Sequence, residues 1–263
     1  LALEGMGIKR VRTDVSVSYL DHNLLYVNTN TPDDHIFLTS IARKYGIWLS
    51  RPGNGIMHSV QYARFGIPGK TSLGTDSHTT THGAFGAMGT GCGATDMATI
   101  LMTGELWFRV PEIIEVRLDG EAQKGVYPKD VILEVLGRIR ADGAVYKAID
   151  FTGSYVEKLN VAGRMTICNM AVEMGAKTAY MQPNADVLNY VDKRAVRPYE
   201  VQFTDPDFQY EESYVFDVSK IEPNLACIRE TLRLGEQTPL LPFSAEKGTG
   251  REALVRAIFD AVG

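Results

Sequence analysis

The chain has 263 residues, 44% of them apolar, which suffices for one large or two ordinary domains with a sizeable core. A formal net charge of −5 without any long basic run argues against a dedicated nucleic-acid-binding protein. No apolar stretch approaches the roughly 18–20 residues of a membrane helix, so we expect neither a nucleic-acid nor a membrane partner. The chain opens with Leu1, without a secretory signal, and we expect the natural protein to start further upstream.

The first part of the chain alternates predicted strands and helices. Strands are expected at residues 11–19, 47–49 and 70–73, and a helix at residues 32–45 with acidic residues in its first turn. A loop rich in Pro and Gly separates the second and third strands. A further helix is expected over residues 94–106, and we place a domain boundary after it, near residue 108.

The second part continues the alternation. Strands are expected at residues 113–118 and 149–152, and helices at residues 128–140 and 165–174, whereas residues 185–215 form a connecting region without a predicted regular element. Strands that alternate with helices predict βαβ units and a mostly parallel sheet, hence an α/β fold. The predicted units are residues 1–108, 109–227 and a tail, 228–263.

The three cysteines Cys92, Cys168 and Cys227 lie far apart and form no CxxC pair. Their odd number and long spacing argue against a disulfide framework. A reducing, cytoplasmic location is therefore the expectation.

Polar side chains follow several of the predicted strands. Asp21 and His22 follow the first, His58 follows the Gly-rich loop, and residues 76–78 (Asp-Ser-His) follow the third. Ligands of parallel α/β sheets gather beyond the carboxyl ends of the strands, and an adjacent Asp can prepare a His to exchange protons. A single Asp-His pair is common and a lone His is usually structural, but three such histidines favour an active site. A zinc site formed by the three imidazoles is an alternative.

Several segments of the chain resemble the aconitase family, in the family's order and at its approximate spacing. The resemblance covers roughly residues 1–227 and is carried by residues 16–23, 50–58, 74–79, 128–133 and 166–176. It implies parallel-sheet subdomains of three layers, α/β/α. It also implies a hydro-lyase that isomerises a hydroxy-tricarboxylic acid, citrate to isocitrate through cis-aconitate, with a [4Fe-4S] cluster in the complete enzyme.

The resemblance also assigns catalytic roles to matching positions. Asp21 and His22 would form the pair that protonates the leaving hydroxyl, and His58 would pair with Glu173. A poor leaving group needs such a proton donor as well as a metal.

The remaining matching positions would contact the substrate and the iron. Asp76 and His78 would hydrogen-bond the iron-bound water or hydroxyl, Ser77 would hold a substrate carboxylate, and Asn169 would lie near the cluster. No residue of this chain is predicted to ligate a metal directly.

The chain departs from the family pattern in three ways. The Gly-Ser-Cys-Thr-Asn type of cluster motif is absent, so we expect no cluster on this chain alone. The later domain with the serine base and the substrate-binding arginines is also absent, so further chain or a partner subunit is needed. Ala2 stands where aconitases often have Gln, and residues 81–86 (Thr-His-Gly-Ala-Phe-Gly) read more like the isopropylmalate and homoaconitate isomerases. A large-subunit fragment of such an isomerase, or a catalytically inactive binding protein, is the alternative.

Two further segments have competing interpretations. Gly89, Gly91 and Gly93 could favour an anion at a helix N-terminus, but close packing of helix against sheet is the preferred interpretation. In the tail we expect a strand at residues 238–243, a loop at 244–250 that resembles the last base loop of small GTPases, and an amphipathic helix at 251–262. Because the chain has no G-x-x-x-x-G-K-[ST] loop, we expect no GTP binding.

Overall fold

A computed structural model describes residues 2–26, 28, 30–223 and 250–262. It has the expected α/β class, and every strand pair within its three sheets is parallel. The elements follow in chain order: α1 (Ala2–Gly5), β1 (Val17–Tyr19), α2 (Asn30–Tyr45), β2 (Trp48–Ser50), α3 (Met57–Arg64), β3 (Thr71–Gly74), the 3-10 helix η1 (Ser77–Phe85), β4 (Met88–Gly91), α4 (Ala94–Thr103), β5 (Ile113–Asp119), α5 (Pro128–Ile139), β6 (Ala148–Thr152), α6 (Ser154–Lys158), α7 (Val161–Asn169), the 3-10 helix η2 (Met170–Met174), β7 (Thr178–Tyr180), α8 (Ala185–Asp192), β8 (Glu212–Asp217), the 3-10 helix η3 (Val218–Lys220) and α10 (Arg251–Val262).

The first sheet is a short pair, β1 with β2, and the loop after β1 carries Asp21 and His22. The strand predicted at residues 11–19 is shorter in the structure because its first half bonds elsewhere. The Val11 amide donates to the Tyr45 carbonyl at 3.1 Å and the Arg12 amide to the Leu101 carbonyl at 2.9 Å. These bonds go to the ends of α2 and α4, so only residues 17–19 are left to pair with β2.

The second sheet, β3 with β4, is packed tightly against η1. A Cβ at Gly89 of β4 would lie 2.2 Å from the Thr79 carbonyl oxygen, and a Cβ at Gly83 of η1 would lie 2.0 Å from the Ala179 carbonyl oxygen of β7. Both contacts are far below van der Waals distance. Close packing, the preferred interpretation, therefore holds for Gly89, with a 3-10 helix as the packed element, whereas a Cβ at Gly93 would make only an ordinary contact, 3.7 Å from Asp96 Oδ2.

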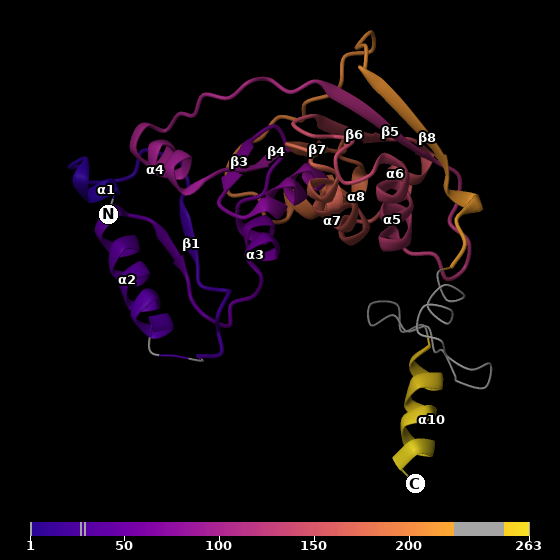
Figure 1. Cartoon of the computed structure of the whole chain (residues 1–263), viewed down its shortest axis with the longest axis horizontal. Coiled ribbons are helices and arrows are strands. Elements are labelled where there is room, and N and C mark those ends of the chain that lie inside the picture. Colours follow the sequence, from indigo (N-terminus) through magenta and orange to yellow (C-terminus); the bar gives the residue numbers. More distant parts are fainter. Residues whose placement is uncertain (1, 27, 29, 224–249, 263) are drawn as a thin grey trace.

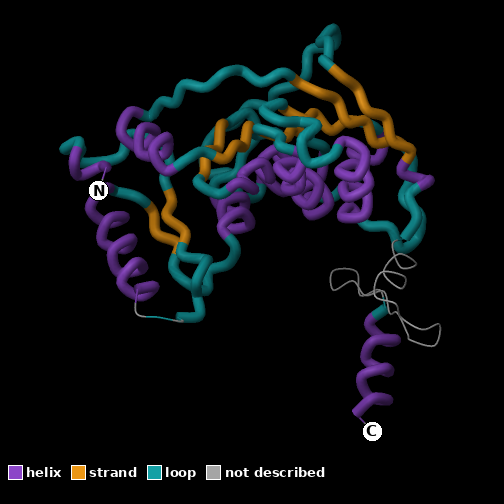
Figure 2. Tube along the Cα trace, viewed as in Figure 1, coloured by secondary structure: helices purple, strands orange, loops and turns teal. Residues whose placement is uncertain are grey.

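The third sheet has four strands in the order β7-β6-β5-β8 and carries the main core. Strand β5 alternates, with Ile114, Val116 and Leu118 fully buried and the residues between them more open. These apolar side chains share one core cluster with residues of α5 and α7, and Figures 1 and 2 show the helices along one side of the sheet. Burial of this apolar face is the main stabilising contribution of the sheet.

The opposite face of this sheet is covered in part by a loop. Asp150 of β6 lies beside Glu115 of β5 in the parallel register, and both lie on that face. The Tyr210 hydroxyl donates to the Asp150 carboxylate at 2.7 Å. Residues 202–210, which sequence analysis left without regular structure, therefore form a strap over the strand starts.

The helix predicted at residues 251–262 is confirmed as α10. The strand predicted at 238–243 and nearly all of the GTPase-like loop lie outside the described residues, as does Cys227. The boundary near residue 108 stays a prediction, and η1 packs across it against α7 and β7. Within the described ranges no helix has the length and apolar character needed to cross a membrane.

Candidate active site

Asp21 and His22 form a pair directly after β1. The Asp21 carboxylate accepts a hydrogen bond from His22 Nδ1 at 2.9 Å with one oxygen and from the Met57 amide at 2.6 Å with the other. Met57 is the first residue of α3, so Asp21 is held at a helix N-terminus, where a negative charge is favoured. The hydrogen bond and charge of Asp21 raise the pKa of His22, with a further contribution from the charge of Asp76. The His22 side chain is 74% exposed, so this ring is open to solvent.

A second pair joins α3 to the end of β3. His58 lies one residue into α3, is buried, and places Nε2 3.1 Å from Asp76 Oδ1. Asp76 also begins η1, because its Oδ1 accepts from the His78 amide at 2.8 Å. Burial raises the pKa of Asp76, but the hydrogen bonds from His78 and His58 outweigh it and the net shift is downward. Asp76 therefore stays ionised and fixes two histidines.

The third pair is His78 with Glu173, and it corrects a prediction. His78 Nε2 lies 3.2 Å from Glu173 Oε1, whereas sequence analysis paired Glu173 with His58. The reason lies in packing: η1 lies against α7 and η2, so Glu173 of η2 faces the first turn of η1, while His58 approaches Asp76 from α3. The result is an alternating row of imidazoles and carboxylates: His58, Asp76, His78 and Glu173.

Ser77 and Asn169 flank this row. Ser77 is exposed, with its hydroxyl oxygen 3.4 Å from His78 Nδ1. Asn169, the last residue of α7, donates from its side chain to the Thr81 hydroxyl at 2.9 Å. The neighbouring Thr80 hydroxyl donates to the Cys168 carbonyl at 2.9 Å. These bonds hold η1, and with it Ser77 and His78, against the end of α7.

An aromatic layer lies behind the row. His82 is 4% exposed, and its ring stands edge-on to that of His58, with centroids 6.1 Å apart. On its other side it contacts Tyr62, which in turn stacks on Phe85 at 4.4 Å. Burial, with a smaller effect of the His58 charge, lowers the pKa of His82 to about 3, so this ring is neutral. His58 Nδ1 and the Tyr62 hydroxyl are buried and have no hydrogen-bond partner among the described residues.

The predicted histidines therefore form two groups. His58 and His78 share Asp76, while among the described residues His22 is hydrogen-bonded to Asp21 alone, and it lines a cavity of ≈320 Å³ beside α2. Throughout the described ranges, His, Cys, Asp and Glu form no group of three that could hold a metal ion. The zinc interpretation needs the three imidazoles at one point, whereas His22 pairs with Asp21 and the other two share Asp76.

All of these residues lie within the range matched by a family comparison. The profile described as Aconitase family (aconitate hydratase) matches residues 8–237, which is most of the chain. The chain belongs to the aconitase family.

Curated relatives within the aconitase family are large subunits. A probable methanogen homoaconitase large subunit of Methanothermobacter thermautotrophicus is 46% identical over 213 residues, which is 80% of this chain and 50% of that protein. A 3-isopropylmalate dehydratase large subunit of Methanopyrus kandleri is 44% identical over 230 residues, 85% of this chain and 54% of that protein. The corresponding protein of Pyrococcus furiosus is 43% identical over 226 residues, 84% and 53%. The chain spans about half the length of the curated relatives it matches.

The cysteines described in this aconitase-family chain do not fit the family's iron–sulfur cluster. Cys168 is fully buried in the core, and burial raises the pKa of its thiol, so a thiolate there is unfavourable. Cys92 is half-buried, its pKa is also raised by burial, and its thiol donates to the Gly74 carbonyl at 3.5 Å. A cluster is normally held by several thiolates, and these two side chains do not supply them.

Sequence reasoning missed the supporting residues of the site. His82 and Thr81 entered only as part of a family-like motif, and Tyr62 was not singled out. An available signal was the spacing of His58, Tyr62 and Phe65, which places apolar and aromatic residues on one side of a short helix. The loop glycines before it obscured the start of that helix.

Proposed function

We propose that this chain is the amino-terminal catalytic part of the large subunit of an aconitase-type hydro-lyase. Substrates of the homocitrate or 3-isopropylmalate class are favoured over citrate, because the relatives carry the names homoaconitase and 3-isopropylmalate dehydratase. Residues 81–86 support the same choice. A segment equivalent to the half of the relatives that this sequence does not match, together with a small subunit, would complete the site.

The observation that carries this proposal is the pair Asp21–His22 beside the row from His58 to Glu173. Loss of water from a hydroxy acid requires a proton for the departing hydroxyl. His22 has a raised pKa, which favours its protonated form, and its exposed ring is open to an approaching hydroxyl. Asp21, held by the Met57 amide, orients the ring and balances its charge.

The row would hold and reprotonate the oxygen that leaves and returns. Asp76 stays ionised between His58 and His78, and Glu173 lies on the other side of His78, so two carboxylates flank that imidazole. Ser77, exposed at the start of η1, would donate to a substrate carboxylate. Asn169 would act as a positioning residue, because its contact with Thr81 fixes the turn that carries Ser77.

The proposal is tested by completing the protein. The chain is joined to the carboxyl-terminal half of the Methanothermobacter homoaconitase large subunit and combined with that enzyme's small subunit. Turnover of homocitrate, 3-isopropylmalate and citrate is followed by the ultraviolet absorbance of the unsaturated acid. We expect turnover of one of the first two, and a loss of about 10²–10⁴-fold in kcat for His22→Gln. A clear preference for citrate would contradict the proposed substrate class.

The inactive binding protein remains the second candidate, and the same preparation distinguishes it. In that case the acids would shift the NMR resonances of η1 without turnover, and Ser77→Ala would weaken binding. For the proposed enzyme, Ser77→Ala should raise KM as well as lower kcat, because the carboxylate contact exists in the ground state too. Turnover unchanged in His22→Gln would refute the role of His22.

A further inference from the structure

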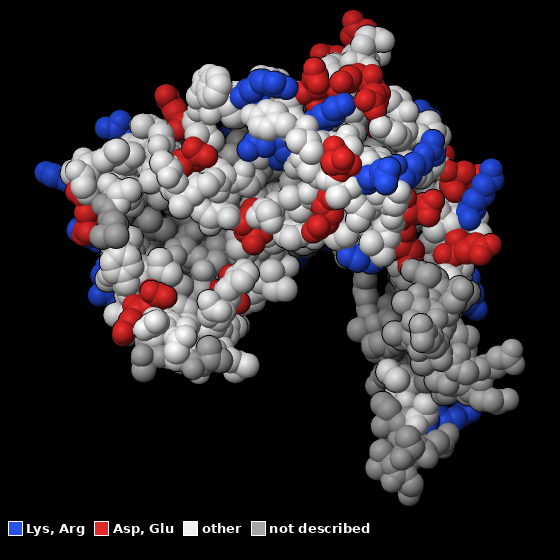
Figure 3. Space-filling model, in the orientation of Figure 1, with Lys and Arg blue, Asp and Glu red and all other residues white. Residues whose placement is uncertain are grey.

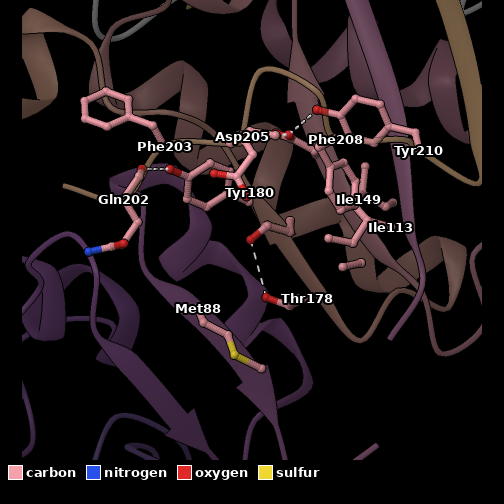
Figure 4. A pocket seen from close by; sticks show the side chains of 14 residues that line it. Met88, Ile113, Ile149, Thr178, Tyr180, Gln202, Phe203, Asp205, Phe208 and Tyr210 are labelled. Carbon is pink, nitrogen blue, oxygen red and sulfur yellow. Dashed lines mark hydrogen bonds between the residues drawn. The ribbon is translucent and has the colours of Figure 1, made fainter. Parts of the chain in front are cut away.

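A second cavity lies away from the candidate active site. It has a volume of ≈330 Å³ and lies at the starts of β5, β6 and β7, on the sheet face turned away from α5 and α7. Residues 202–210 form its other wall, and Met88 of β4 closes one side (Figure 4). None of the eight candidate site residues lines it. A volume near 300 Å³ is at the lower end of small-molecule sites.

Most of the lining is apolar, with one buried charge. Ile113, Ala148 and Phe208 contribute apolar surface, and the 39% exposure of Phe208 places that ring at the rim. Asp150 is only 5% exposed, although it is a carboxylate. A charge so buried is costly unless other groups pair with it.

The partners of Asp150 satisfy only half of its carboxylate. The Tyr210 and Thr204 hydroxyls donate to Oδ2 at 2.7 and 3.1 Å, and within the described ranges no donor reaches Oδ1. No ion pair involves Asp150 in that part of the chain. One carboxylate oxygen beside an apolar cavity is therefore available to a ligand.

The surrounding charges select the kind of ligand. The charged residues that line the cavity are Asp150 and Asp205, and Glu115 lies beside Asp150 in the sheet. Figure 3 shows further acidic side chains gathered over the loop that leads into β8. An anionic ligand would meet carboxylates, and a neutral one would leave Asp150 without a countercharge. A cation with an apolar body satisfies both the charge and the lining.

We propose that this cavity is a second ligand site that binds a small primary ammonium compound, with the ammonium on Asp150 and an apolar chain or ring against Ile113, Ala148 and Phe208. The alternative is that Asp150 only fastens the strap of residues 202–210. Both interpretations keep the bonds to Tyr210 and Thr204, and they differ in whether the charge of Asp150 is needed. The proposal does not depend on the proposed hydro-lyase function.

The test compares two probes of nearly equal shape on the 263-residue chain. Benzylamine carries a positive charge at neutral pH, whereas benzyl alcohol does not. Affinities are measured by ligand-observed NMR titration near pH 7.5, with backbone amide shifts used to locate binding. We expect benzylamine to bind about tenfold tighter than the alcohol, as a charge-assisted hydrogen bond predicts, and to shift amides at the starts of β5, β6 and β7.

Two variants test whether the charge of Asp150 causes the preference for benzylamine. Asp150→Asn keeps an oxygen acceptor for Tyr210 and Thr204 but removes the charge, so the amine should lose its advantage. Asp205→Asn removes an exposed, screened carboxylate on the same rim and should change the advantage by no more than about twofold. Equal affinity of the two probes for the unaltered chain, or an advantage that survives Asp150→Asn, would overturn the proposal.

The pH dependence of benzylamine binding to the unaltered chain gives a test that does not require any variant to fold. Burial raises the pKa of Asp150 more than its hydroxyl partners lower it, and the charge of Glu115 adds to the rise. The advantage of benzylamine should therefore disappear on acidification at a higher pH than an ordinary aspartate would give. Affinity for benzyl alcohol should stay constant over the same range. A benzylamine advantage that is independent of pH through this range would exclude Asp150 as the partner.

Discussion

His82 makes a sharp prediction about how stability changes with pH. Its ring is buried between His58 and Tyr62, and burial holds its pKa near 3 in the folded chain. In the unfolded chain a histidine titrates near about 6.5. Below that pH the unfolded chain takes up a proton at His82 that the folded chain cannot accept. The contribution of His82 to the free energy of unfolding is therefore lost as pH falls from about 6.5 towards 3.

The size of the effect follows from linkage. Between pH 7 and pH 5 the proton bound by the unfolded chain lowers the free energy of unfolding by about 2 kcal/mol. This figure hardly changes while the folded pKa stays below about 4, because the folded ring is then neutral at both pH values. The replacement His82→Gln keeps a neutral polar side chain of similar length that does not titrate. Its free energy of unfolding should thus fall about 2 kcal/mol less over the same interval.

The measurement is urea denaturation followed by circular dichroism at pH 7, 6 and 5, for the unaltered chain and for His82→Gln. Every other titrating group is common to both proteins and cancels in the comparison. His22→Gln is a control of opposite sign, since the raised pKa of His22 stabilises the folded state at low pH and is lost as pH rises. Parallel stability curves for the unaltered chain and His82→Gln would refute the assignment of a neutral, desolvated His82.

Three further predictions concern the core. Gly83→Ala should lower the free energy of unfolding by more than about 3 kcal/mol, because its Cβ would collide with a carbonyl oxygen of β7. Gly137→Ala, on the open side of α5, is the control and should raise the free energy of unfolding by about 0.5–1 kcal/mol. Urea titration measures both. Arg164→Met should cost about 3 kcal/mol or more, since the buried guanidinium donates to three main-chain carbonyls that would lose their donor; an unfolding midpoint equal to that of the unaltered chain would contradict this. In thiol labelling of the native chain, Cys92 should react before Cys168, and equal rates by mass spectrometry would show that the core opens readily.

The elements that sequence analysis identified have strong local signals. Strand β5 alternates apolar and polar residues, and α5 begins with Pro128 at a position that favours helix starts. Helix α8 was missed although its signal is present. Asn184 caps it by accepting from the Val187 amide at 3.0 Å, and Val187 and Val191 are buried four residues apart. The acidic and aromatic residues that follow concealed it.

Other elements could not be identified from local pattern. Strand β7 has only three residues, and η1 consists mainly of small and polar residues that are buried because neighbouring glycines permit close approach. Thr79, Thr80 and Thr81 are buried by contacts with two other elements. The end of α7 lies far away in the sequence, and β4 follows η1 directly. Tertiary packing, rather than propensity, decides such segments.

The candidate site shows the same division between local and tertiary information. Adjacent residues were correctly placed together, as with Asp21 and His22. The partner of His58 depends on where α3 lies relative to the end of β3, which is a property of the assembled fold. The family resemblance supplied the residues of the row but paired Glu173 with His58, whereas in the structure Glu173 pairs with His78.

Contacts from both halves of the chain hold the row of His58, Asp76, His78 and Glu173 in position. Asp76 Oδ1 is hydrogen-bonded to both the His78 amide and His58 Nε2. One oxygen atom therefore fixes the first turn of η1 relative to α3. The far end of η1 is fixed by the second half of the chain, since the Met181 amide donates to the Gly83 carbonyl at 3.1 Å and Asn169 donates to Thr81. A displacement of α7 or β7 would therefore move η1, and with it His78, relative to α3 and His58. The large sheet and its helices thus control the site through η1, because the short sheets β1-β2 and β3-β4 have too few strands to be independently stable.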